Sequence, residues 1–204
     1  MWDLIIKKLK NRIATAYIST AQMPAYNIFR GHLRSISVDI EDAIAIFISD
    51  ILPTKNYKLF LDPSIHINGN NNKLDLIRPD LLVVSTDNNS NKIVAMIEIK
   101  ANMGWCRDAK GVIDDIDTNN KRFLNNKTLT CEFSKYNSET VQYGDDVKLY
   151  LLSLTDNNCS PRLHDQNKDA ASNKGIRYFN LFTGDYDSLV HKEVQDFIND
   201  LLGP

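Results

Sequence analysis

Apolar residues recur at helical spacing in four stretches of this chain. In the first stretch the apolar residues fall three or four positions apart. The second stretch has the same spacing and ends at Pro53. A third stretch is more polar and carries Gly111 near its start, and a fourth closes the chain with a strong apolar stripe. The pattern therefore predicts helices over residues 2–19, 37–52, 107–123 and 186–202.

Shorter runs of apolar and aromatic residues predict strands. Tyr57–Leu61 is the first, and Ile65–Ile67 is expected to continue it past a kink at Pro63. Further strands are expected over residues 80–84, 93–100, 147–154 and 176–182. Residues 124–146 show poor periodicity and are expected to be loop with short elements. Residues 156–175 are a polar connection, long enough to be functional or mobile.

The expected elements between residues 37 and 154 follow one another as helix, three strands, helix and strand. Three sequential strands should form an antiparallel meander. This order predicts an α/β sandwich with a mixed central sheet flanked by helices. The chain has 204 residues, 43% of them hydrophobic, and no linker rich in Pro, Gly or Ser divides it. The length allows two domains, but one domain over residues 1–204 is expected, with its core at about 37–154 and a terminal extension on each side.

Composition and charge narrow the class of protein. No apolar run approaches the roughly 20 residues that span a bilayer, so no membrane partner is expected. Near the start, lysines follow the apolar residues, the reverse of a secretory signal, which favours a cytoplasmic protein. The net charge of −2 indicates no global basic field, although acidic residues can mask a local basic groove. The scattered cysteines and histidines predict neither a disulfide framework nor a zinc site.

Two apolar runs, Arg78–Val84 and Ile93–Lys100, flank a polar segment with the composition of a hairpin loop. If the hairpin is centred on this segment, Asp80 lies opposite Glu98, with their Cβ atoms about 5 Å apart on one sheet face. Lys100 shares this face, because strand side chains alternate with period two. The hairpin therefore gathers two carboxylates and one amine at one end.

Such a pair of carboxylates needs a positive partner, because at about 4 Å they repel by about 4 kcal/mol at an effective dielectric of 20. A hard divalent cation with oxygen ligands is the natural candidate, with Mg²⁺ the first choice and Mn²⁺ a substitute. Val94 and Met96 are expected on the same face, and charged groups that continue an apolar face indicate the edge of a cleft. A solvent-facing salt bridge at a strand end is the alternative.

Pro79-Asp80 followed by Glu98-Ile99-Lys100 resembles the signature of the PD-(D/E)xK nuclease superfamily, which has the restriction-endonuclease-like fold. The family core is α-β-β-β-α-β, the order expected here from residue 37 to residue 154, somewhat over half of the chain. The motif is short, so its context carries the resemblance: Asp at a strand start, and Glu-x-Lys at the end of the next strand. The resemblance implies a restriction-endonuclease-like sandwich and metal-dependent cleavage of phosphodiester bonds.

The resemblance assigns Asp80 and Glu98 to the metal ion, together with the backbone carbonyl of Ile99. Lys100 would orient or help to deprotonate the attacking water and offset charge in the transition state. Family members often carry a further Glu on the helix before the meander, a place that Glu41 fits beside the apolar stripe of that helix. An ordinary acid of a first helical turn is the alternative for Glu41.

Recombination and exonuclease relatives often carry Gln-x-x-x-Tyr on the helix after the motif, and residues 107–123 lack it, which favours the restriction-like branch. Several side chains near the predicted active edge are expected to contact nucleic acid. These are Arg34, Lys73, Arg78, Asn102, Trp105 and Arg107. A core position for Trp105 and a solvated loop position for Lys73 are the alternatives. Base recognition would come from the connections at 124–146 and 156–175.

Three functions remain open. The leading hypothesis is a Mg²⁺-dependent DNA endonuclease of the restriction type. It would act on double-stranded DNA as a homodimer, because symmetric cleavage of both strands needs two sites. The second is a nuclease of the same fold in repair, mobile-element processing or RNA processing. The third is a non-catalytic nucleic-acid-binding or assembly module, against which the complete set of Asp80, Glu98 and Lys100 argues.

Overall fold

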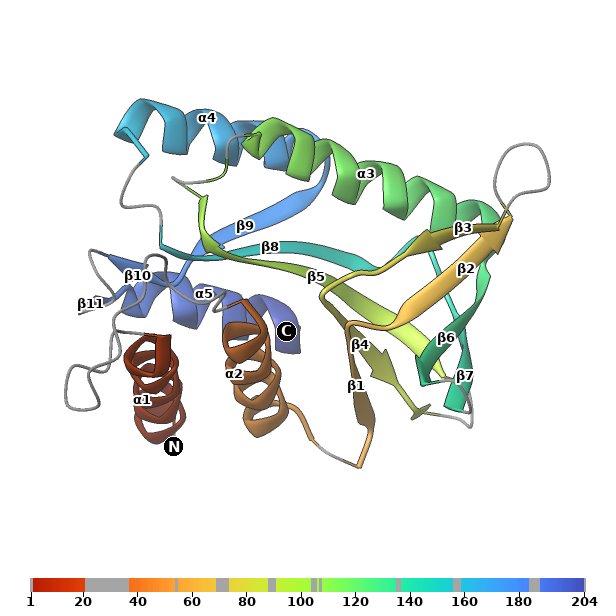
Figure 1. The fold of residues 1–204 in the computed structure, drawn as a ribbon, viewed down its shortest axis with the longest axis horizontal. Helices are drawn as coiled ribbons and strands as arrows, with labels where there is room; N and C mark the ends of the chain where they lie inside the picture. Colours follow the sequence, from red (N-terminus) through yellow and green to blue (C-terminus); the bar gives the residue numbers. More distant parts are fainter. Residues whose placement is uncertain are drawn as a thin grey trace, which may run out of the picture.

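The computed structural model describes residues 2–20, 37–53, 55–68, 74–87, 91–103, 106, 108–134, 137–155, 159–183 and 188–203. The helices are α1 (Trp2–Thr20), α2 (Ser37–Ile51), α3 (Ala109–Asn126), α4 (Pro161–Ser172) and α5 (His191–Leu202) (Figure 1). Among the described helices, none is both long and apolar enough to cross a membrane. Apolar spacing had predicted α1, α2, α3 and α5, but α5 begins at His191 and not at residue 186, because Ser188–Leu189 form a short strand.

The strands form one large sheet and a small separate pair. The large sheet holds β1 (Tyr57–Leu61), β2 (Ser64–Asn68), β3 (Leu74–Ile77), β4 (Leu81–Ser85), β5 (Lys92–Asn102), β6 (Thr128–Ser134), β7 (Asn137–Gln142), β8 (Lys148–Thr155) and β9 (Ile176–Asn180). The pair is β10 (Phe182–Thr183) and β11 (Ser188–Leu189).

The large sheet is mixed. β1, β4 and β5 form the expected antiparallel meander, in which Leu61 pairs with Leu81 and Leu81 also pairs with Ile97. Beyond β5 the pairing with β8 and then β9 is parallel, since a helix returns the chain before each of these strands. The series α2, β1, β4, β5, α3, β8 therefore repeats the predicted order of helix, three strands, helix and strand. The hairpins β2–β3 and β6–β7 are inserted into it.

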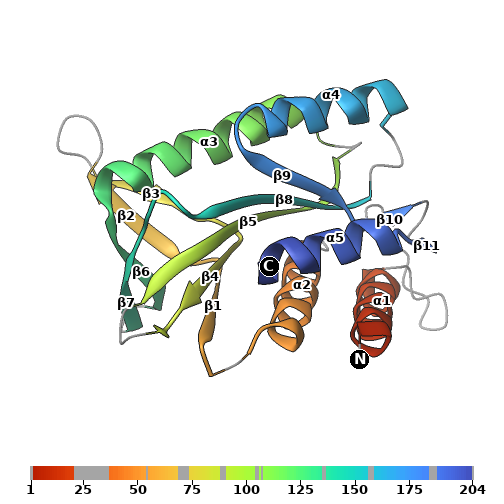
Figure 2. The ribbon, with the colours of Figure 1, turned by 180° about the vertical axis from the view of Figure 1, so that it is seen from behind.

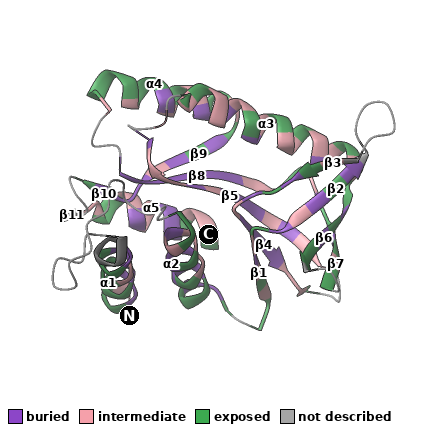
Figure 3. Cartoon of the chain, in the orientation of Figure 1, coloured by how far each residue is buried: buried purple, intermediate pink, exposed green. Residues whose placement is uncertain are grey.

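Helices cover both faces of the sheet: α3 and α4 lie on one face, and α1, α2 and α5 on the other (Figures 1 and 2). Alternate residues of β5 therefore enter two cores. Ile97 and Ile99 pack with α1, α2 and α5, whereas Met96 packs with Ile113 and Ile116 of α3. Because both faces are covered, β4 and β8 are buried along nearly their whole length (Figure 3).

The β2–β3 hairpin corrects one expectation. Ile65–Ile67 was expected to continue the strand Tyr57–Leu61, and this is wrong. Asp62 has a positive φ of 45° and Pro63 follows it, so the chain turns away there. β2 then pairs with β3 and β6 instead of extending β1.

The two segments expected to be connections contain regular structure. Residues 124–146 hold the β6–β7 hairpin, in which buried Leu129, Cys131 and Val141 alternate with polar residues. Residues 156–175 hold α4, which begins where the Ser160 hydroxyl accepts a hydrogen bond from the Leu163 N–H. Both elements carry few apolar residues, because each has only one face on the core, and this weakened their periodicity.

The β4–β5 hairpin contains one irregularity. Its register shifts by one residue, so that Val83 pairs with Ala95 but Val84 pairs with Ile93. The extra residue, Val94, packs against the core of α1, α2 and α5, whereas Met96 lies in the core under α3. The expectation that Val94 shares the face of Met96 is therefore wrong.

Candidate active site

Asp80 and Glu98 lie across from each other at the end of the β4–β5 hairpin. The pair Leu81–Ile97 sets the register there, and one further step brings Asp80, in a bend just before β4, opposite Glu98. β5 is eleven residues long and runs past the start of β4 while it still pairs with β8. The register expected from the sequence is therefore the register of the sheet at this end.

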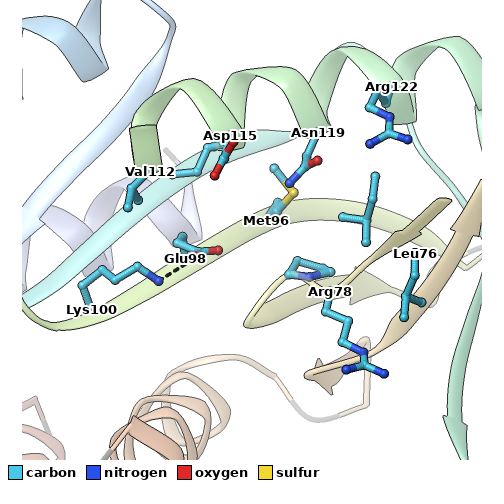
Figure 4. Close-up of a pocket in the computed structure, with 12 residues that line it drawn as sticks. Leu76, Arg78, Met96, Glu98, Lys100, Val112, Asp115, Asn119 and Arg122 are labelled. Atoms are coloured by element: carbon cyan, nitrogen blue, oxygen red, sulfur yellow. Dashed lines mark hydrogen bonds and ion pairs between the residues drawn. The ribbon is translucent and has the colours of Figure 1, made fainter. Parts of the chain in front are cut away.

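Lys100 joins the two carboxylates. Its ammonium nitrogen lies 2.5 Å from Glu98 Oε1 and 3.8 Å from Asp80 Oδ2. Asp80 Oδ2 also accepts a hydrogen bond of 2.6 Å from the Ile99 N–H. The exposed fractions are 20% for Asp80, 25% for Glu98 and 30% for Lys100, so a ligand can reach the group. Figure 4 shows the Glu98–Lys100 ion pair facing the cavity under α3.

The charges of this group are not balanced. Burial raises the pKa of Asp80, and the neighbouring Lys100 offsets only part of this increase. Burial also raises the pKa of Glu98, and repulsion from Asp80 adds to it. Burial alone would lower the pKa of Lys100, but the attraction of both carboxylates outweighs it and raises that pKa. One ammonium therefore leaves residual negative charge, which an additional cation would relieve.

Glu41 lies on α2 within electrostatic reach of this group. Its pKa is raised to about 7, first by burial and then by repulsion from Asp80 and Asp62. Lys100 and Glu98 also act on this pKa, in opposite directions. The Glu41 side chain is half-buried. It is therefore not an acid in open solvent, and α2 brings it toward the hairpin carboxylates.

Asp62 is an acid of this region that sequence reasoning missed. It follows β1, and its N–H donates a 2.9 Å hydrogen bond to the Asp80 carbonyl. The pairing of Leu61 with Leu81 thus continues by one step, and Asp62, Asp80 and Glu98 stand in one row across β1, β4 and β5. An acid directly after a predicted strand was the available signal, but its place became clear only with the pairing of β1 and β4.

A cavity of about 470 Å³ adjoins the Lys100–Glu98 pair. It lies between β3, β5 and α3, as Figure 4 shows. Its lining residues are Leu76, Ile77, Arg78, Pro79, Met96, Glu98, Lys100, Val112, Asp115, Ile116, Asn119 and Arg122. Sequence reasoning did not predict that α3 lines this cavity. The available signal was the spacing of three and four positions between the lining residues from Val112 to Arg122, which places their side chains on one helix face.

The expected nucleic-acid contacts divide into two groups. Arg78 lines the cavity, and its Nε donates a 3.1 Å hydrogen bond to Ser64 Oγ. Asn102 is the half-buried last residue of β5, paired with Thr155 of β8, and does not line the cavity. The others, Arg34, Lys73, Trp105 and Arg107, lie outside the described residues.

The oxygen donors at this site suit a small hard cation. Within the described ranges, no group of three or more His, Cys, Asp and Glu side chains is arranged to hold a metal ion. Mg²⁺ needs fewer protein ligands, because it is often bound by one or two carboxylates and keeps several waters. Asp80 and Glu98 are two such carboxylates. Because the N–H and C=O of a strand residue point to the same side, the Ile99 carbonyl is directed to the side where its N–H meets Asp80.

No protein-family model, curated protein or solved structure matches this chain.

Proposed function

We propose that the protein is a Mg²⁺-dependent endonuclease that cleaves phosphodiester bonds of DNA and has the restriction-endonuclease-like fold. The observation that carries the proposal is the contact of one ammonium, that of Lys100, with the opposed carboxylates of Asp80 and Glu98. The order α2, β1, β4, β5, α3, β8 in a mixed sheet supports the fold. A homodimer of the restriction type would bring two such sites to the two strands of a duplex.

Asp80, Glu98 and the Ile99 carbonyl would hold the metal ion, with Glu41 as a further acid beside them. A bound Mg²⁺ or Mn²⁺ would neutralise the nonbridging oxygens of the scissile phosphate and support the leaving oxygen. The protonated Lys100 would donate a hydrogen bond to the attacking water and offset negative charge in the transition state. Its ammonium donates a hydrogen bond to Glu98 in the structure, which fits the role of a donor.

The test is a cleavage assay on plasmid, single-stranded DNA and RNA with Mg²⁺, with Mn²⁺ and with a chelator. The parent should cleave DNA only with metal, and Lys100→Ala should lower the rate at least about a hundredfold. Lys92→Ala is the matched control, because Lys92 begins the same strand and pairs with Asp146 at the far end from the site. Its rate should equal that of the parent.

The outcomes separate the three functions. Preferential cleavage of RNA would change the substrate class and keep the site. Equal rates for the parent and Lys100→Ala would remove Lys100 from the chemistry. If the parent cleaves none of the three substrates with either metal, a non-catalytic binding or assembly module becomes the better account.

A further inference from the structure

The two inserted hairpins leave part of the large sheet covered on one side only. β2 pairs with both β3 and β6, so the strands β3, β2, β6 and β7 lie side by side. One side of this group packs in the core under α3 through buried residues such as Ile65 and Cys131. The opposite side carries exposed residues, and no described helix lies over it (Figures 1 and 3).

The side chains of this opposite side stand in two rows across the four strands, and these two rows are here called the open face. The register of the strand pairs aligns them, because directly paired residues share a sheet face. The first row is Arg78, Ser64, Glu132 and Ser138. The second row is Leu76, His66, Thr130 and Thr140.

The first row adjoins the candidate active site. Arg78 lies two residues before Asp80, a separation of about 7 Å in extended chain. The hydrogen bond from Arg78 Nε to Ser64 Oγ holds this arginine against β2, and its guanidinium points away from α3 (Figure 4). Among the described side chains, no carboxylate forms an ion pair with Arg78. A ligand that reaches Asp80 can therefore extend onto the open face and meet this cation.

The distribution of charge favours the open face as the path of a polyanion. Glu132 is the one acid in the two rows, and its carboxylate lies 3.3 Å from His66 Nε2, so a protonated ring offsets its charge. Helix α2, which borders the site through Glu41, holds four acids and no Lys or Arg. These acids repel a phosphate backbone, whereas Arg78 attracts it. A nucleic acid at Asp80 is therefore directed over the hairpins and away from α2.

The kinds of side chain on the open face suit a duplex. Arginine and the hydroxyls of Ser and Thr are groups that contact the phosphate and sugar oxygens of double-stranded DNA. Proteins that bind single strands on a sheet stack the bases on aromatic side chains. The two rows contain no Phe, Tyr or Trp. The open face therefore offers contacts to a backbone and lacks a platform for unpaired bases.

We propose that the open face docks the double-stranded DNA that flanks the cleavage site. Arg78 binds the backbone phosphate nearest to Asp80, and the hydroxyls of Ser138, Thr130 and Thr140 bind sugar and phosphate oxygens further along the duplex. The inference rests on the proposed nuclease function and names the form of its substrate. It assigns the two inserted hairpins to substrate binding and leaves the chemistry to the active-site group.

The experiment measures duplex binding separately from cleavage. A short fluorescein-labelled DNA duplex is titrated with the full chain by fluorescence anisotropy, with Ca²⁺ in place of Mg²⁺, at several salt concentrations. Thr130→Glu places a negative charge in the open face and should weaken binding about tenfold. Thr15→Glu is the matched control, because it adds the same charge at an exposed position of α1, on the opposite side of the molecule (Figure 1), and should bind like the parent. Arg78→Ala should weaken binding and reduce the slope of log affinity against log salt by about one.

Thermal melting shows whether each variant folds, and Thr140→Glu on the neighbouring strand makes the same test if Thr130→Glu does not. Equal duplex binding by the parent, Thr130→Glu and Arg78→Ala, in a chain that still cleaves DNA, would overturn the open face and leave the nuclease proposal standing. Tighter binding of the single strand, or of an RNA duplex of the same sequence, would also overturn it. Weaker duplex binding by Thr130→Glu in a chain that cleaves nothing would support the open face and reject the nuclease.

Discussion

Replacing Glu41 by Gln should stabilise the metal-free protein, and the gain should grow with pH. The pKa of Glu41 is raised from 4.5 to about 7 in the folded state, mainly by burial. A raised pKa means that the folded state holds the proton more tightly than the unfolded chain. Folding stability is therefore lost as the pH rises from about 4.5 to about 7 and stays low above that range. Gln cannot ionise, so the variant avoids this loss.

The size of the effect follows from the pKa of Glu41. One pKa unit corresponds to about 1.4 kcal/mol, so a change from 4.5 to about 7 amounts to about 3 kcal/mol near pH 8. Near pH 5 the folded protein keeps Glu41 protonated while the unfolded chain is partly ionised, and the gain falls to about 1 kcal/mol. Because the side chain is half-buried, solvent screening reduces both values.

The assay is urea unfolding of the parent and Glu41→Gln at several pH values between about 5 and about 8, with a chelator present. Asp42→Asn is the matched control, since it removes an exposed carboxylate one residue further along α2. Its effect should stay within about 0.5 kcal/mol throughout. A gain for Glu41→Gln that does not change with pH, or a loss of stability near pH 8, would refute the reasoning.

Two further variants test the metal site and the packing behind it. Asp80→Asn keeps an oxygen that can accept the Ile99 N–H hydrogen bond and removes a repelling charge, so without metal it should be at least as stable as the parent. Mg²⁺ should raise the melting temperature of the parent more than that of this variant, and equal shifts would count against the site. Tyr150→Phe removes the buried hydroxyl that donates a 2.6 Å hydrogen bond to Asp200 Oδ2. Urea unfolding should show a loss of about 1 kcal/mol, and cleavage activity should not change.

The central hairpin could be predicted from the sequence because its information is local. Two apolar runs and a polar turn between them set the register, and this register places Asp80 opposite Glu98. The bulge at Val94 could not be predicted, since both faces of the hairpin are apolar and either placement of Val94 fits the pattern. Apolar residues on both faces identify a buried strand from its sequence, but they do not reveal a one-residue shift in its pairing with the next strand.

The surroundings of the hairpin depend on contacts between distant segments. Asp62 reaches the site only because β1 pairs with β4 across the inserted β2–β3 hairpin. Helix α3 could be predicted, but the rotation that turns Asn119 and Arg122 into the cavity is set by the packing of Ile113 and Ile116 on the sheet. The sequence of one helix or strand alone determines neither this strand pairing nor this helix rotation.

The row formed by Asp62, Asp80 and Glu98 can exist only after the chain has folded. Asp62 directly follows β1, Asp80 directly precedes β4 and Glu98 lies on β5, so the three acids meet only when these strands are paired in register. A slip of one residue would turn the side chains of a strand to the opposite face. β5 also pairs with β8, and β8 is synthesised later than β5. A nascent or partly unfolded chain therefore lacks the assembled carboxylates, and the proposed cleavage of nucleic acid would begin only when the central sheet has formed.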